Sequence, residues 1–108
     1  MNLSASTLTG TPVKNGQGDS LGKIEDLMID TTTGVVSYAV LSFGGFLGMG
    51  DKLFAVPMQG MQIDAEDQHF LLNESKERLK DAPGFDKDNW PDFADPKWQQ
   101  TIFSFYAV

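Results

Sequence analysis

The chain has 108 residues with 15 acidic and 8 basic side chains, a net charge of −7, and no cysteine. One small domain of this length buries a modest core, and the lack of cysteine excludes disulfides and thiolate metal sites. Nucleic-acid binding depends on clustered Lys and Arg, so an acidic chain whose only arginine is Arg78 is predicted to have no nucleic-acid partner.

The first ten residues are rich in Ser and Thr and contain neither a basic segment nor an apolar run. We expect an arm or an irregular first strand here, and no secretory signal peptide. Thr11 to Lys14 is predicted to be a short strand entering a hairpin, because the Asn15-Gly16 pair supplies the positive φ that tight hairpins need. Nowhere does an apolar run approach the roughly 20 residues that span a bilayer. We therefore expect a cytoplasmic protein with no membrane span.

Lys23 to Asp30 is predicted to form the next strand. Its apolar residues do not alternate cleanly, which indicates a β-bulge near Glu25 and Asp26. After a turn at 30–34, the segments 35–43 and 53–58 are apolar on both faces, which is typical of strands buried on both sides. The interior of a small barrel accounts for only one of these faces, so another element is expected to cover the other.

The segments 61–63 and 70–72, with the acidic turn 64–68 between them, predict a last hairpin. Helical signals appear only after it. Ser75 is a predicted N-cap for a short turn over 76–82. Asp95 and Pro96 form a strong helix start, because Pro at the first helical position lacks an N–H that would be unpaired there. One face of this helix is expected to dock as a lid on the barrel: Trp98, Ile102 and Phe105.

Four segments resemble the PRC-barrel family: GKIEDL at 22–27, YAVLSFGG at 38–45, KLFAVP at 52–57 and PGFDKDNWP at 83–91. This family includes a barrel of the photosynthetic reaction-centre H subunit and one in a ribosome maturation factor. The resemblance implies a mainly β protein, a small, mostly antiparallel barrel of about six strands over residues 1–82. Residues 83–108 are then an aromatic linker and a C-terminal helix.

In that family the barrel is an assembly module, which caps a membrane complex or meets a ribosomal protein. The resemblance therefore implies a stand-alone bacterial interaction domain that is not an enzyme. We expect it to associate with itself as a homodimer or a larger homo-oligomer, with or without another protein partner. A small-molecule or ion-binding sensor barrel stays open as the alternative.

Seven residues are candidates for an interface. Three lie in the glycine-dense loop 44–50, where apolar side chains are costly to leave in water, and four lie in the aromatic C-terminal part. They are Phe46, Leu47, Met49, Trp90, Trp98, Phe105 and Tyr106. The loop does not fit a phosphate-binding loop, because Asp51 precedes Lys52 and Leu53 stands where a Ser or Thr is needed. The aromatic residues are expected to form either the lid on the barrel or a binding surface. The two interpretations are compatible if the binding surface is a dimer interface.

No catalytic residue, cofactor site or metal site is predicted. Asp86, Asp88 and Asn89 resemble the start of a calcium loop, but Trp90 and Pro91 interrupt it and Lys97 replaces its last acid. The turn acids Asp64, Glu66 and Asp67 are expected to be solvated. The single histidine, His69, has no nucleophile beside it in a catalytic motif and is expected to face outward from its strand.

Overall fold

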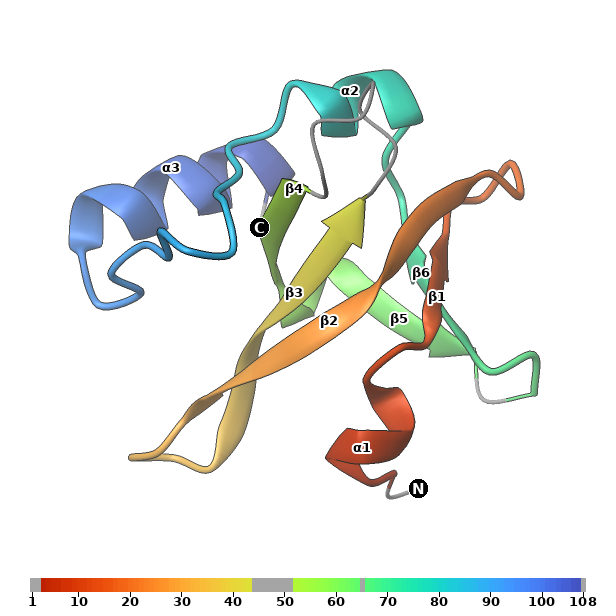
Figure 1. The fold of residues 1–108 in the computed structure, drawn as a ribbon, viewed down its shortest axis with the longest axis horizontal. Coiled ribbons are helices and arrows are strands. Elements are labelled where there is room, and N and C mark those ends of the chain that lie inside the picture. Colours follow the sequence, from red (N-terminus) through yellow and green to blue (C-terminus); the bar gives the residue numbers. More distant parts are fainter. Residues whose placement is uncertain (1–2, 44–51, 65, 108) are drawn as a thin grey trace.

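The computed structural model describes residues 3–43, 52–64 and 66–107 (Figure 1). Within these residues six strands form one sheet in the order β4-β3-β2-β1-β6-β5. The strands are β1 Pro12–Lys14, β2 Ser20–Asp30, β3 Val35–Phe43, β4 Lys52–Pro57, β5 Met61–Asp64 and β6 His69–Leu72. Every neighbouring pair is antiparallel except β1 and β6, which are parallel.

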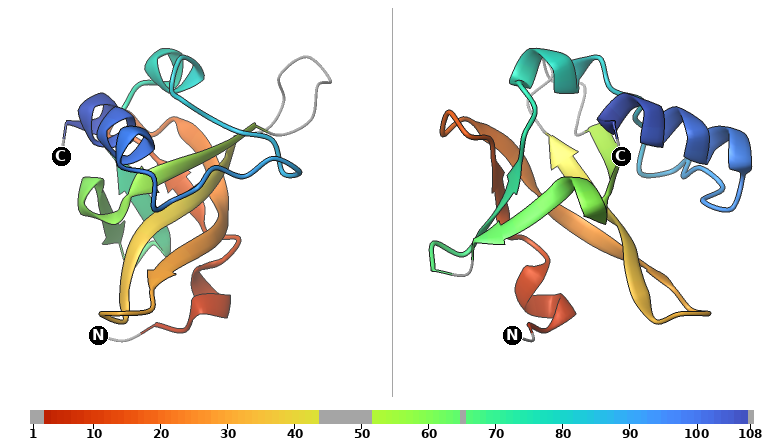
Figure 2. Two further views of the ribbon diagram at one scale, coloured as in Figure 1. Left: turned by 90° about the vertical axis from the view of Figure 1, so that its left-hand side faces the viewer. Right: turned by 180° about the vertical axis from the view of Figure 1, so that it is seen from behind.

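The sheet curls into a half-barrel, with α3 along one side (Figure 2). The predicted fold class, a mainly β and mostly antiparallel barrel of about six strands, is confirmed. The helices are α1 Ala5–Leu8, α2 Lys76–Lys80 and α3 Pro96–Tyr106, and a 3₁₀ turn, η1 Met58–Gly60, joins β4 to β5. No helix in the described parts of the chain is long and apolar enough to cross a membrane.

The strand β2 carries the predicted bulge, because its register with β3 shifts between Ile24 and Asp26. A second shift lies between Met28 and Ile29, where Ser37 of β3 has no opposing residue. Bulges bend a strand and increase its twist. They account for the way the β2–β3 hairpin curves away from the sheet toward the lower left of Figure 1.

The N-terminal expectation was wrong, because residues 5–8 form a helix rather than an irregular strand or an arm. Local hydrogen bonds explain it. The Ser4 hydroxyl accepts from Thr7 N at 3.1 Å, and the Thr9 hydroxyl donates to the Ala5 carbonyl at 2.8 Å. Short polar side chains of this kind favour a capped turn over a strand.

The turn between β1 and β2 also differs from the prediction. Its positive φ lies at Gly18, at +85°, and not at Gly16. The buried side chain of Asn15 organises the turn instead, since its Oδ1 accepts from Gln17 N at 3.1 Å and from Asp19 N at 2.9 Å. The Asn-Gly pair is thus a side-chain-stabilised loop and not a tight two-residue hairpin.

The core lies inside the curl of the sheet. The largest fully buried apolar side chains come from five of the six strands and from α2 and α3, and they include Val13, Leu21, Ile24, Leu41, Phe54, Phe70, Leu79 and Ile102. Residues 38–42 of β3 and 53–57 of β4 are all buried, which confirms that these two strands are covered on both faces.

The helix α3 provides the second cover, because it packs on β4 and buries Ile102 to 1% exposure. The helix begins where predicted, with Asp95 Oδ1 accepting from Lys97 N at 3.0 Å and Pro96 in its first turn. Ser75 caps α2 in the same way, accepting from Arg78 N, although that helix ends at Lys80 and not at residue 82.

Candidate interaction surface

An aromatic cluster joins β3, the linker and α3. The ring of Tyr38 lies 5.6 Å from that of Phe93, 5.3 Å from that of Trp98 and 6.2 Å from that of Phe103, between centroids. Tilted and edge-on pairs at these distances are favourable beyond the area that they bury. The linker is thereby held against the sheet and is part of the surface that the fold presents.

The linker also has polar support. Trp90 Nε1 donates to the carbonyl of Lys87 at 2.7 Å, and Gln99 Nε2 donates to the carbonyl of Phe93 at 2.8 Å. Burial raises the pKa of the Tyr38 hydroxyl, because the charged form loses hydration. These contacts fix the position of Phe93, which lines the groove described below.

The end of the β2–β3 hairpin, residues 28–37, extends beyond its neighbouring strands, and we call it the hairpin arm. The strand β1 pairs with β2 no further than Lys23, and β4 pairs with β3 only as far as the Tyr38–Pro57 pair. The arm is therefore a two-stranded ribbon, which alone is marginal in water. Two of its apolar side chains are well exposed, Ile29 at 53% and Val35 at 60%.

A groove of about 620 Å³ runs between the hairpin arm, η1, and α3 with the segment just before it. Its lining is mostly apolar and aromatic, and includes Met28, Tyr38, Pro57, Met58, Phe93 and Phe103. The single charged residue of the lining is Asp30, whose Oδ1 accepts from Thr32 N at 2.9 Å inside the turn of the arm. An apolar groove continuous with exposed Ile and Val side chains is typical of a protein-binding surface.

The predicted interface residues take different positions. Trp90 is 38% exposed beside the Phe85 ring, and Trp98 is half-buried within the aromatic cluster. Phe105 is half-buried under the Arg78 guanidinium, which lies 4.2 Å from its ring centroid. Tyr106 is 7% exposed and packs in the core, so it has little surface to offer a partner. The remaining three candidates, Phe46, Leu47 and Met49, lie outside the described residues.

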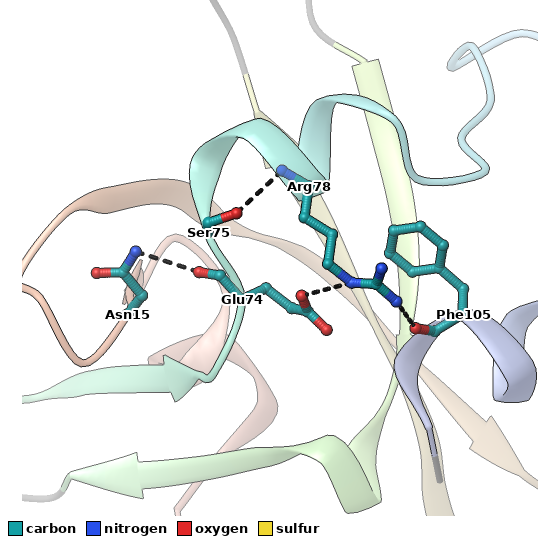
Figure 3. A network of polar contacts seen from close by, with 5 residues as sticks. All are labelled: Asn15, Glu74, Ser75, Arg78 and Phe105. Carbon is teal, nitrogen blue, oxygen red and sulfur yellow. Dashed lines mark hydrogen bonds and ion pairs between the residues drawn. The ribbon is translucent and has the colours of Figure 1, made fainter.

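A polar network holds the C-terminal end of α3 (Figure 3). Asn15 Nδ2 donates to the Glu74 carbonyl at 3.1 Å, and Arg78 Nε lies 2.9 Å from the Glu74 carboxylate. Arg78 Nη2 donates to the carbonyl of Phe105. A guanidinium provides several donors in a fixed fork, which suits bridging of this kind. The turn before β2, the segment after β6 and α3 are thereby linked.

Close to this network, the Tyr106 hydroxyl is buried and has no hydrogen-bond partner in the described part of the chain. Burial is the main reason that the pKa of this hydroxyl is raised, the Glu74 carboxylate raises it further, and Arg78 opposes both. A neutral, protonated hydroxyl is therefore the form that the fold favours.

The β5–β6 hairpin brings together a group that sequence reasoning missed. Asp64, Asp67 and His69 each offer one ligand atom, and these atoms lie within 4.8 Å of one another. The register explains the meeting, because Asp64 and His69 are the cross-strand pair that closes the hairpin. All three side chains are exposed or half-exposed. The predicted pairing of strands 61–63 and 70–72 already held this signal, since it places residues 64 and 69 opposite each other.

The curled six-stranded sheet defines the class of the molecule as a small β-barrel-type domain, here with an apolar groove on its surface. The chain belongs to the PRC-barrel domain family, whose model matches residues 1–79. The resemblance to this family is therefore confirmed over the three motifs at 22–57, whereas the fourth, at 83–91, lies beyond the match. The match ends within α2, so the aromatic linker and α3 lie beyond it. No curated protein matches the chain.

Proposed function

We propose that this protein is a non-enzymatic assembly module that associates with itself. The observation that supports the proposal most is the apolar groove, which continues onto the exposed Ile29 and Val35 of the hairpin arm. Apolar surface of this kind is costly in water and is typical of sites that another protein covers. Membership of the PRC-barrel family, a general module, is consistent with such a role.

The chemistry of the groove supports binding rather than catalysis. Among its lining residues the titratable side chains are Asp30, engaged in its own turn, and Tyr38, with its raised pKa. An active site needs titratable groups that converge on a reacting atom with matched pKa values. Met, Phe and Val side chains, which dominate here, offer contact area instead.

Light scattering over a concentration series tests the proposal. We expect the mass of a dimer or a larger oligomer, with dissociation at low concentration. A mass of one chain at every concentration up to the millimolar range would contradict self-association. Circular dichroism on the same samples checks that the β-sheet is intact.

The alternative, an ion-binding barrel, has one observation in its favour, the meeting of Asp64, Asp67 and His69. Mixed carboxylate and imidazole ligands suit Zn²⁺ or Mn²⁺. We expect binding weaker than micromolar, since the ligands are solvated and Asp64 Oδ1 already accepts from the backbone N–H groups of Glu66 and Asp67. Calorimetry with Zn²⁺ and Mn²⁺ decides: micromolar affinity that His69→Ala abolishes would favour the alternative.

A further inference from the structure

We propose that two copies of this chain pair along the open edge of β3, antiparallel and about a two-fold axis close to Val36. Each copy then places its hairpin arm beside the groove of the other. This inference rests on the proposed self-association and names the surface and the symmetry that it uses.

The first observation is the open edge itself. The ladder between β3 and β4 ends at the pair Tyr38–Pro57, because the chain turns at Pro57 into η1. Proline has no N–H to donate and commonly marks the end of a strand. In the described chain, residues 35–37 of β3 therefore have no strand beside them on that side. A strand edge without a neighbouring strand is a template for another strand, and of its backbone groups Val35 N already donates to the Thr33 hydroxyl at 3.3 Å.

The second observation is that residues 35–37 carry no charge and no proline. Natural proteins protect edge strands with lysine, proline, inward-pointing charges or β-bulges, and of these only the bulge at Ser37 is present here. Residues 35–37 are Val, Val and Ser, and Val35 is the most exposed large apolar residue of the described chain, at 60%. The arm thus offers an extended, uncharged, β-branched segment to a partner strand.

The third observation is that the groove occupies the place that a continuation of β4 would take. It is lined by Val35, Val36 and Ser37 on one side and by η1 and α3 on the other. A strand added to the edge of β3 would lie in this groove, with its side chains against Met58 and Phe103. The edge and the groove form one docking surface.

The low charge of the groove allows a second copy to be the occupant. At a net charge of −7, two copies repel each other over most of their surfaces. The groove is the place where they meet without that cost, because Asp30 is its single charged residue and is bound within its own turn. The occupant must be extended, apolar and uncharged, and residues 35–37 of the partner fit this description.

Symmetry supports the same choice. Most homodimers have a two-fold axis, so that the same surface patch of both subunits forms the interface. Antiparallel pairing of a strand with its own copy satisfies this condition, since the axis passes between equivalent residues. One such contact pairs both open edges and covers Ile29, Val35 and the groove of both copies.

Cysteine crosslinking tests the geometry directly, because the natural chain has no cysteine. Single variants Val35→Cys, Val36→Cys and Ser37→Cys place a thiol along the proposed axis, and Ser6→Cys in α1 is an exposed control. Near the axis two equivalent β-carbons lie roughly 4.5–5.5 Å apart, and a small local shift brings them to the roughly 3.5–4.5 Å of a disulfide. Under mild oxidation we expect at least one arm variant to form covalent dimers about tenfold faster than the control. Equal rates for all four variants overturn the proposal.

A charge variant provides a second test that does not depend on oxidation. Val35→Lys puts two lysines close together across the axis, so we expect the dissociation constant to rise about tenfold or more. Val35→Thr keeps the β-branched shape without a charge and should leave the dimer largely intact. Thr101→Lys adds the same charge to α3, away from the arm, and should have little effect. Circular dichroism verifies that each variant is folded.

The outcomes separate this inference from the proposed function. If the wild type is a dimer but the arm variants neither crosslink nor weaken it, the inference is wrong and the proposed self-association stands. If the wild type scatters light as a single chain and no variant crosslinks, both are wrong.

Discussion

Two glycines show how the demands on a single residue depend on its neighbours. Gly22 and Gly34 both have positive φ, at +103° and +77°. A β-carbon at Gly22 would lie 2.0 Å from the carbonyl oxygen of Ser42 in the neighbouring strand, whereas one at Gly34 would meet nothing within 4 Å. Both positions disfavour a side chain through φ, but only Gly22 is also closed by packing.

We therefore predict that Gly22→Ala lowers the free energy of unfolding by more than about 3 kcal/mol, since strain and a backbone clash act together. The matched variant Gly34→Ala should cost about 1–2 kcal/mol, from its φ alone. Urea denaturation of both variants measures the difference. Equal losses would show that the strand β3 yields easily at Ser42.

Tyr106 provides a second prediction at this scale. Its hydroxyl is buried without a partner in the described residues, so Tyr106→Phe should change stability at pH 7 by no more than about 1 kcal/mol. The pKa of this hydroxyl is raised in the fold, above its ordinary value of about 10. The fold therefore favours the protonated hydroxyl. The contribution of this group to the free energy of unfolding is fully present below about pH 10 and is lost as the pH rises beyond it.

The wild type should consequently lose more stability than Tyr106→Phe between pH 8 and about pH 11. Urea denaturation of both proteins at the two pH values measures this difference, and lysines, which titrate in the same range, affect both proteins alike. Parallel losses would show that Tyr106 ionises as readily in the fold as in the unfolded chain, so that its pKa is not raised.

Among the elements, α3 is the helix that packs on β4. It lies at the side of the half-barrel (Figure 2), and its Ile102 and Tyr106 are in the core. The aromatic cluster holds the first half of the helix through Trp98, and Arg78 holds its end through the Phe105 carbonyl. A cation at the C-terminus of a helix also interacts favourably with its dipole.

We predict that Ile102→Ala costs about 2–5 kcal/mol of stability, as large-to-small changes in a core do. Thr101→Ala, one residue earlier and exposed, should stay within about 0.5 kcal/mol. Truncation after Asp95 should expose the outer face of β4 and produce binding of a hydrophobic dye. A truncated protein that melts like the full chain and binds no dye would show that the helix is not a lid.

At the scale of the whole molecule, charge and apolar surface act against each other. A net charge of −7 keeps copies apart at long range, while the groove and the hairpin arm favour contact at short range. Salt screens the repulsion between the charges and weakens the apolar contact only little.

Self-association should therefore strengthen when NaCl is raised from about 50 mM to about 1 M, where the Debye length falls to roughly 3 Å. Sedimentation at several protein concentrations measures the dissociation constant at each salt concentration. Weaker association at high salt would point to ion pairs between copies and away from an apolar interface.

The sequence by itself determined those features that depend on residues close together in the chain. Asp95 and Pro96 mark the start of α3, Ser75 caps α2, and the irregular apolar pattern around Glu25 indicates the bulge. Capping, proline geometry and alternation are local, so a pattern of a few residues is enough to specify them. The segments 35–43 and 53–58 are apolar on both faces and therefore also required an element to cover the second face, which α3 provides.

Only the tertiary structure decided where these elements meet. Tyr106 is buried because α3 is rotated to place it with Ile102 against the core, although the sequence pattern also allowed it to be on the surface. Residues 35–37 of β3 are left open because β4 turns away at Pro57, about twenty residues later in the chain. Both outcomes depend on contacts between distant segments, which local propensity does not encode.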